Sequence, residues 1–145
     1  MKLSSNSFKN EESIPERYTC NEENIFPDLI IEDIPEKAKS FALIMEDPDA
    51  PSGTFVHWLI WNIPLEKTRI SEGELLNCPQ GKNDLGNLGY DGPCPLEGMH
   101  RYFFKLYALD AELDLESGSD KEGLANAMKG HIVGRTELVG NYERE

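Results

Sequence analysis

The chain has 145 residues and a mass of 16.4 kDa, a size that indicates one domain able to bury its own core. Its 27 acidic and 14 basic residues give a formal net charge of −13. That balance argues against nucleic acid and anionic membrane surfaces as partners, because both attract clustered Lys and Arg. We therefore expect a single domain over residues 1–145 that holds its ligand in a local pocket.

Cysteine usage and the start of the chain bear on the cellular compartment. The three cysteines (Cys20, Cys78 and Cys94) form no CxxC pair, and an odd number argues against a disulfide framework. No apolar run of the signal-peptide type follows Lys2, and no stretch approaches the ~20 apolar residues of a membrane span. The sequence predicts a soluble, cytoplasmic protein with free thiols.

Short apolar segments separated by Gly and Pro predict a mostly β protein. In chain order, we expect strands at residues 28–33, 40–46, 55–63, 100–109 and 135–142. A capping-box pattern, Ser119 with Glu122, precedes apolar residues at helical spacing and predicts one helix from about Asp120 to Val133. Parallel βαβ units are absent from the pattern, which therefore favours a β-sandwich with one late helix.

Alternation along two of these strands assigns side chains to faces. The segment 55–63 is apolar on both faces and is expected to be a buried central strand, with one face formed by Phe55, His57, Leu59 and Trp61. In the segment 100–109, the shared face is formed by His100, Tyr102, Phe104 and Leu106. Residues 79–98 lie between them, rich in Gly and Pro, and an irregular stretch of this length is usually functional or floppy.

The first candidate for chemistry is Asp47-Pro48-Asp49-Ala50-Pro51, directly after the strand at 40–46. Its two prolines fix the backbone and extend the residues before them, so the loop is able to hold a carboxylate in one place. A solvated turn is the simple alternative. A calcium loop is excluded, because its fifth and twelfth positions would be Pro51 and Trp58.

Two histidines form the second candidate. His100 and Tyr102 point the same way on one strand, whereas His57 lies on a buried strand where a satisfied core role is an open alternative. Two imidazoles, a phenol and the exposed backbone of residues 89–95 offer donors to phosphate or carboxylate oxygens. Because an unpaired carboxylate would repel an anion, we hypothesise that Asp47 accepts a hydrogen bond from one ring and fixes its tautomer. Sequence spacing does not show that the two rings meet.

Other chemistries have weaker support. Zinc would have to gather its ligands from Cys20, Cys78, Cys94, His57 and His100 without any local ligand pair, and we expect no metal or cofactor. Cys94 with His100 is a conceivable nucleophile–base pair. Cys94 lies between two prolines, however, and not at the thiolate-stabilising N-terminus of a helix.

Two ordered motifs carry a resemblance to a known family. Asp47-Pro48-Asp49-Ala50-Pro51 is followed by His57-Trp58, and Gly89-Tyr90-x-Gly92-Pro93-x-Pro95 is followed by His100-Arg101-Tyr102. This pattern resembles the phosphatidylethanolamine-binding protein family, and within it the bacterial and archaeal branch of Raf kinase inhibitor-like proteins. The likeness covers nearly the whole chain.

The resemblance implies a β-sandwich in which a smaller sheet packs on a large central antiparallel sheet, with a C-terminal helix. It also implies a small pocket for anions such as phosphate, phosphoethanolamine or a carboxylate. Carried over position by position, the ligand-binding residues would be Asp47, Ala50, Pro51, His57, Gly92, Pro93, His100 and Tyr102. Leu96 stands where many relatives have a second proline, and the loop before His100 is short, so we expect a rim of different shape.

We interpret the sequence as a non-enzymatic binding protein whose pocket takes a small anion. His57 and His100 would supply donors, with the Tyr102 hydroxyl and a backbone N–H near Gly92. The alternative is a hydrolase that uses Asp47, His57, His100 and Cys94. A third class is a regulator or inhibitor of a partner enzyme, with the acidic surface as the partner face. Because relatives often pair, a homodimer is also compatible with the resemblance.

Overall fold

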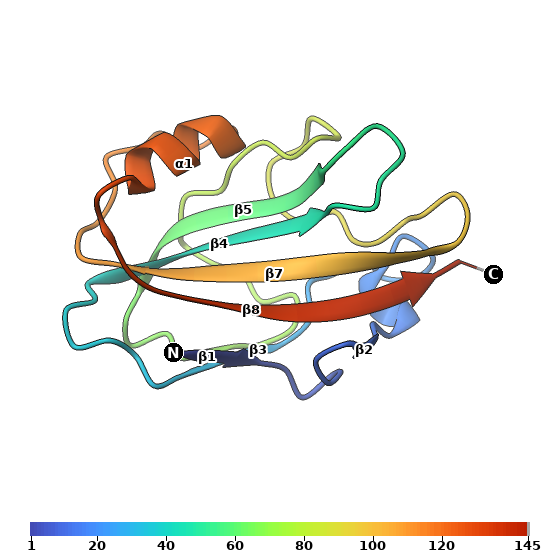
Figure 1. Ribbon diagram of the computed structural model, residues 1–145, viewed down its shortest axis with the longest axis horizontal. Helices are drawn as coiled ribbons and strands as arrows, with labels where there is room; N and C mark the ends of the chain where they lie inside the picture. Colours follow the sequence, from blue (N-terminus) through green and yellow to red (C-terminus); the bar gives the residue numbers. More distant parts are fainter. Residues whose placement is uncertain (145) are drawn as a thin grey trace.

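Two β-sheets and one short helix make up the computed structural model, which describes residues 1–144 (Figure 1). The larger sheet has the order β2 (Glu12–Ser13), β8 (Ile132–Glu143), β7 (Met99–Leu109), β4 (Ser40–Asp47) and β5 (Phe55–Pro64). The smaller sheet has the order β1 (Lys2–Ser4), β3 (Leu29–Glu32) and β6 (Arg69–Ile70). A 3₁₀ turn at Glu16–Tyr18 and helix α1 at Lys121–Met128 complete the elements. The mainly β architecture expected from the sequence is confirmed.

All pairings in both sheets are antiparallel except one. The two-residue β2 runs parallel to β8 at the sheet edge. The short strands β1, β2 and β6 lay outside the sequence prediction, since two or three residues are too few to show an alternating pattern. No helix within residues 1–144 is long and apolar enough to cross a membrane.

The strand β4 lies inside the molecule, as its apolar sequence predicted, and all eight of its residues are buried. Phe41, Leu43 and Met45 face the smaller sheet and join the main apolar cluster between the two sheets. Ala42 and Ile44 face the other way, into a second cluster that α1 covers with Leu124 and Met128. Burial on both faces makes β4 a rigid support for the loop that follows it.

The predicted facing of β5 is wrong in part, because β-bulges interrupt its alternation. Met45 pairs with Trp58 and Glu46 with Val56, so His57 is an extra residue on the β5 side. As a result His57 and Trp58 both lie toward the main cluster, where the ring of His57 packs 5.3 Å from that of Tyr102. The bulge therefore turns His57 toward the face of β7 on which alternation placed His100 and Tyr102.

The helix is shorter than the sequence predicted. Its N-cap is Asp120, whose carboxylate accepts a hydrogen bond from the Gly123 amide, and not Ser119. It ends at Met128, and Gly130 has a positive φ of 83° that a helix does not allow. The chain then enters β8 at Ile132, so Val133, predicted as helix, belongs to a strand.

The loops that carry the candidate motifs gather at one end of the larger sheet, at the right of Figure 1. Antiparallel pairing brings the end of β4, the start of β5, the start of β7 and the end of β8 to this end of the sheet. The stretch 79–98 is irregular, as predicted, and contains only isolated bridges. Motifs far apart in the sequence are in this way placed side by side.

Candidate ligand-binding site

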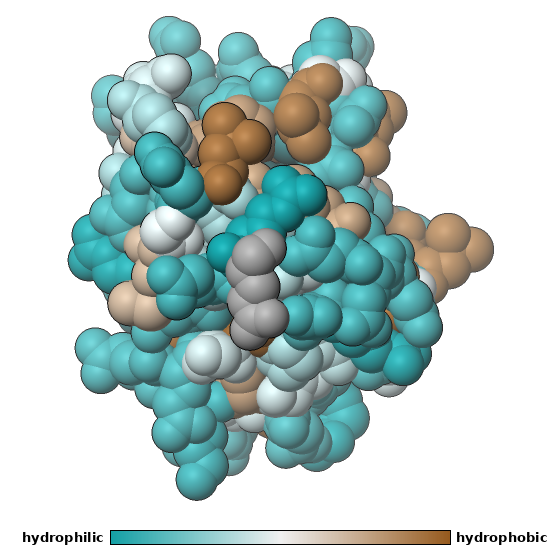
Figure 2. Space-filling model, turned by 90° about the vertical axis from the view of Figure 1, so that its right-hand side faces the viewer, coloured by the Kyte–Doolittle hydropathy of each residue, from teal (hydrophilic) through white to brown (hydrophobic). Residues whose placement is uncertain are grey.

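A cavity of about 550 Å³ opens at this end of the sheet. Its polar residues include Asp47, His57, His100 and Tyr102. Its apolar walls are formed by Ala50, Pro51, Phe55, Leu85, Pro95 and Leu96. Figure 2 views the molecule from this end and shows a mostly hydrophilic surface interrupted by separate apolar patches. A cavity with apolar walls and a few convergent polar groups is typical of small-molecule sites.

The polar centre of the cavity is a His–Asp pair. The Nδ1 of His100 lies 2.6 Å from Oδ2 of Asp47. The Asp47 side chain is buried, with 4% of its surface exposed, and the His100 side chain keeps 12% exposed. The other oxygen of Asp47 accepts a hydrogen bond from the backbone amide of Asp49 at 2.7 Å. The hypothesis that Asp47 orients one histidine stays a prediction, and the contact identifies that histidine as His100. Nδ1 therefore carries a proton, which leaves Nε2 for other partners.

The imidazole of His57 is held by a backbone carbonyl and not by a carboxylate. Nδ1 of His57 donates to the carbonyl of Asp91 at 2.7 Å, and Asn83 braces the same loop by donating to the Asp91 carboxylate. Burial lowers the pKa of His57, although the Asp91 carbonyl and the Asp47 charge act in the opposite direction. This ring is therefore neutral near pH 7, with its proton on Nδ1 and a lone pair on Nε2.

The ring of Tyr102 lies near both imidazoles. Its ring centroid is 5.3 Å from that of His57 and 6.4 Å from that of His100. Burial raises the pKa of Tyr102 far above its usual range, and the Asp47 carboxylate raises it further. The phenol thus keeps its proton and can act as a donor at any physiological pH. The three rings predicted from separate motifs meet in one place.

An ion pair outside the cavity anchors the Asp47 loop. Asp49 accepts hydrogen bonds from the Arg101 backbone amide and from Nε and Nη2 of its guanidinium, at 2.9 to 3.0 Å. These bonds lower the pKa of Asp49 to about 2. Because Arg101 follows His100 on β7, the pair ties the loop after β4 to the strand that carries the histidine.

Seven of the eight predicted site residues line the cavity, and Pro93 does not. Pro93 is buried, and its carbonyl accepts a hydrogen bond from the Cys20 amide. The amide of Gly92, expected to face the ligand, already donates to Asn24 Oδ1 at 2.8 Å. A Cβ at Gly92 would lie 2.1 Å from the Tyr18 carbonyl, so glycine is required there for close backbone approach.

The prediction of free thiols is wrong for two of the three cysteines. Cys20 and Cys94 form a disulfide across a sequence separation of 74 residues, and only Cys78 is free. A catalytic Cys94–His100 pair is therefore excluded in this state, because Cys94 has no thiol. Both disulfide residues line the cavity, and sequence reasoning missed them because the two cysteines lie in loops far apart.

Phe55, Leu85 and Leu96 are further wall residues that the motifs did not include as ligand contacts. Leu96 carried a signal, since its departure from the proline of many relatives predicted a different rim. Leu85 carried none, because an isolated Leu in a Gly-rich loop has no periodic neighbours. Within residues 1–144, no group of three or more His, Cys, Asp or Glu side chains is arranged to hold a metal ion.

The two-sheet fold, with the cavity around Asp47 at one end of the larger sheet, is that of a β-sandwich protein. The phosphatidylethanolamine-binding protein family profile matches residues 4–143. The chain is 51% identical to a UPF0098 protein of Methanothermobacter thermautotrophicus over 99% of both chains. It is 47% identical to a UPF0098 protein of Pyrococcus abyssi, over 97% of this chain and 84% of the relative. The chain belongs to the phosphatidylethanolamine-binding protein family.

Solved structures agree with this assignment. A crystal structure of a phosphatidylethanolamine-binding protein homolog from Chlamydia trachomatis superimposes with a TM-score of 0.96 at 41% identity, covering 99% of this chain and 97% of the other. Escherichia coli YbcL, described as a member of the mammalian family, superimposes with a TM-score of 0.91 at 28% identity, covering 99% and 98%. The fold and the family predicted from the motifs are confirmed.

Proposed function

We propose that the protein binds a small anion of the phosphate, phosphoethanolamine or carboxylate type in the cavity around Asp47, in the cytoplasm and without turning it over. Asp47, Ala50, Pro51, His57, His100 and Tyr102 are the ligand contacts. Gly92 serves by shaping the wall, because its amide is already paired. Pro93 acts only as a support behind that wall.

The observation that carries the proposal is the state of the four imidazole nitrogens. Both Nδ1 atoms are occupied, one by Asp47 and one by the Asp91 carbonyl. Neither Nε2 atom has a hydrogen-bond partner within residues 1–144, and no unpaired polar side-chain atom there is sealed from solvent. Both Nε2 atoms are therefore left for a molecule in the cavity that His57 and His100 line.

The two imidazoles have different roles in ligand binding. His100, when protonated on both nitrogens, forms an ion pair with Asp47 and donates from Nε2 to an anionic oxygen. His57 is neutral and accepts from an O–H or N–H of the ligand, because burial lowers its pKa. Tyr102 supplies a further O–H. The best ligand is thus a monoanion with one donor of its own, such as a protonated phosphate ester or phosphoethanolamine.

The chemistry of the lining argues against turnover. No Ser, Thr or Lys lines the cavity, and the two cysteines are bonded to each other. Asp47 is held on one side by His100 and on the other by the Asp49 amide, so its carboxylate is not poised for attack. What remains is a set of fixed donors and acceptors, which bind.

Calorimetric titration with phosphoethanolamine tests the proposal, using wild type and His100→Gln. The matched control is His131→Gln, since His131 forms a similar pair with Asp110 at 2.8 Å but lies exposed and away from the cavity. We expect binding to weaken about tenfold or more in His100→Gln and to stay unchanged in His131→Gln. Equal binding by all three proteins, or multiple turnovers of a phosphate or acyl ester lost in His100→Gln, would overturn the proposal.

A further inference from the structure

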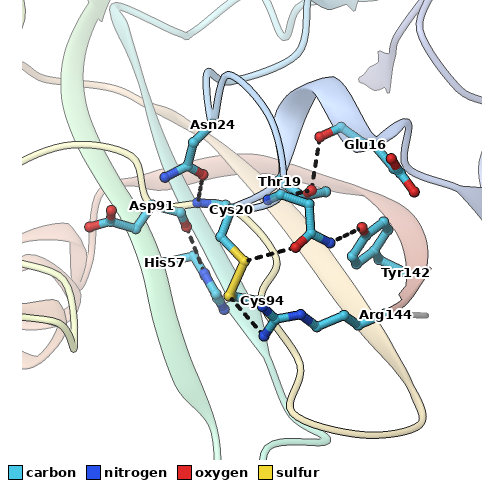
Figure 3. The surroundings of a disulfide bond; sticks show 11 residues. Glu16, Thr19, Cys20, Asn24, His57, Asp91, Cys94, Tyr142 and Arg144 are labelled. Carbon is cyan, nitrogen blue, oxygen red and sulfur yellow. Dashed lines mark hydrogen bonds between the residues drawn. A yellow bond between two sulfur atoms is a disulfide. The ribbon is translucent and has the colours of Figure 1, made fainter.

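One wall of the cavity is closed by a covalent bond between two segments distant in sequence. The disulfide joins Cys20, just after the 3₁₀ turn, to Cys94, which lies between Pro93 and Pro95 (Figure 3). His57 lies on one side of the sulfur pair and Arg144, the residue after β8, on the other. Both cysteines line the cavity, so the bond is part of the binding site itself.

The position of this bond leaves it open to a reducing thiol. Cys94 is exposed and Cys20 is half-buried, at the mouth of a cavity large enough for a small molecule. Thiol–disulfide exchange requires access to a sulfur atom, which buried structural disulfides do not give. The third cysteine does not compete, because Cys78 lies outside the cavity lining and burial raises the pKa of its thiol.

Two neighbours favour the reduced form of the pair. Nη1 of Arg144 lies 3.8 Å from Sγ of Cys94, where the guanidinium charge stabilises a departing thiolate. A stabilised thiolate leaves faster in exchange, so attack at the Cys20 sulfur with Cys94 as leaving group is the favoured direction. Oδ1 of Asn21 lies 4.0 Å from the Cys20 sulfur and is available to accept from its thiol once formed.

The contacts around the bond determine what reduction would release. Three hydrogen bonds hold the two segments together up to Pro93: Cys20 N–H to the Pro93 carbonyl, Gly92 N–H to Asn24 Oδ1, and the Tyr90 hydroxyl to the Tyr18 carbonyl. In the described chain, no hydrogen bond holds residues 95–98 before β7 begins at Met99. Apart from a hydrogen bond between the Cys94 backbone and Tyr102, the disulfide is thus the main restraint on the wall formed by Cys94, Pro95, Leu96 and Glu97.

We propose that the Cys20–Cys94 disulfide is a redox-controlled restraint on this wall, which a cytoplasmic dithiol opens and thereby lowers the affinity of the cavity for its ligand. Two electrons and two protons pass from the dithiol, which becomes a disulfide, and Cys20 and Cys94 become thiols. The effect on affinity rests on the function proposed above, whereas the opening of the wall does not.

The first measurement counts thiols in the folded protein. Oxidised wild type and Cys78→Ser are treated with dithiothreitol without denaturant, alkylated and analysed by mass spectrometry. We expect two alkyl groups, on Cys20 and Cys94, in Cys78→Ser, and about threefold slower labelling in Arg144→Gln. Reduction only under unfolding conditions would overturn the proposal, because the bond would then be a purely structural one.

The second measurement follows the wall and the cavity separately. In hydrogen exchange, reduction is expected to accelerate the amides of residues 94–98 about tenfold or more and to leave β4 and β7 protected. Phosphoethanolamine should bind the reduced protein about tenfold more weakly than the oxidised one. Cys94→Ser is expected to match reduced wild type, and reduced wild type itself serves if that variant does not fold.

The outcomes separate this inference from the proposed function. If oxidised protein fails to bind phosphoethanolamine, the proposed function fails, and thiol counting with hydrogen exchange still decides whether the wall is redox-controlled. If reduction changes neither the exchange of residues 94–98 nor the affinity, the inference is wrong and the binding function stands.

Discussion

Two neighbouring carboxylates at the end of β4 show how one strand serves both stability and binding. Glu46 and Asp47 are both buried, with 5% and 3% of their surface exposed, and they point to opposite faces of the sheet. Glu46 pairs with Lys105 and Lys121, and Asp47 pairs with His100. The partners are what distinguish a closed charge network from an open site.

The carboxylate of Glu46 is fully paired with lysine side chains. Burial alone would raise the pKa of Glu46, but hydrogen bonds from Lys105 and Lys121 outweigh it and lower that pKa. Both ammonium groups bind the same carboxylate, and none of these three side chains lines the cavity around Asp47. Histidine differs because its ring has two nitrogens, so the Asp47–His100 pair satisfies one and leaves the other for a ligand.

Removal of the closed network should give the largest effect on stability. We expect Glu46→Ala to lower the free energy of unfolding by about 2 to 3 kcal/mol, since two ammonium groups lose their buried partner but can still reach water. Phosphoethanolamine affinity should not change. Urea unfolding and calorimetry check the two halves of this prediction, and a loss of affinity equal to that of a cavity variant would remove the distinction between the two carboxylates.

The corresponding substitution of Asp47 should weaken ligand binding. Asp47→Asn removes a negative charge from an anion site, yet we expect the affinity to fall about thirtyfold, or about 2 kcal/mol, because an amide does not stabilise the doubly protonated ring of His100. Titration calorimetry measures the effect, and circular dichroism controls for damage to the loop. Tighter binding by Asp47→Asn would mean that Asp47 acts only as a repulsive neighbour.

The pH dependence of ligand stabilisation sharpens the comparison further. Histidine side chains ordinarily titrate near pH 6.5, and an anion that binds an imidazolium raises the pKa of that ring. The added stability is therefore present at low pH and lost as the pH rises through the raised pKa. We expect phosphoethanolamine to raise the melting temperature by a few degrees more near pH 6 than near pH 8.5.

Wild type, His57→Ala and His100→Ala are compared in that thermal-shift series. The pH dependence should disappear in His100→Ala, whereas Glu46→Gln should keep it. A flat profile in wild type would show that no imidazole is protonated on binding.

The smallest effect concerns the free protein and His57. Its folded-state pKa is lowered by burial, so the unfolded chain binds the proton more readily. The resulting stabilisation is present above about pH 6.5 and is lost as the pH falls toward the folded-state pKa. We expect the urea midpoint of ligand-free wild type to decline more between pH 7.5 and 5 than that of His57→Gln, and parallel declines would contradict a neutral, buried His57.

Much of this fold was open to prediction because apolar runs of strand length are specific signals. The segments 40–46 and 100–109 became β4 and β7 with nearly the expected bounds. The helix end was not predictable in the same way, because Ile132 and Val133 continue the apolar pattern of the helix while Gly130 already ends it. Local patterns identify elements better than they identify the residue at which one gives way to the next.

The candidate site was predictable where it rested on contiguous motifs and not where it rested on long-range contacts. His100 and Tyr102 followed from strand alternation, and Asp47 from the proline-fixed loop. The bulge that turns His57, the pairing of Gly92 with Asn24, and the Cys20–Cys94 bond each depend on segments brought together only by the folded chain. Such contacts leave no periodic trace in the sequence.

The central claim is that anion binding favours protonation of His100 on both ring nitrogens, a state that Asp47 stabilises. Calorimetric titration of phosphoethanolamine at about pH 7.5, in two buffers of different ionisation enthalpy, measures the protons taken up on binding. We predict net proton uptake by wild type and by Glu46→Gln, and neither tight binding nor uptake by His100→Gln. Binding of equal strength in all three proteins, with no proton taken up, would contradict the account.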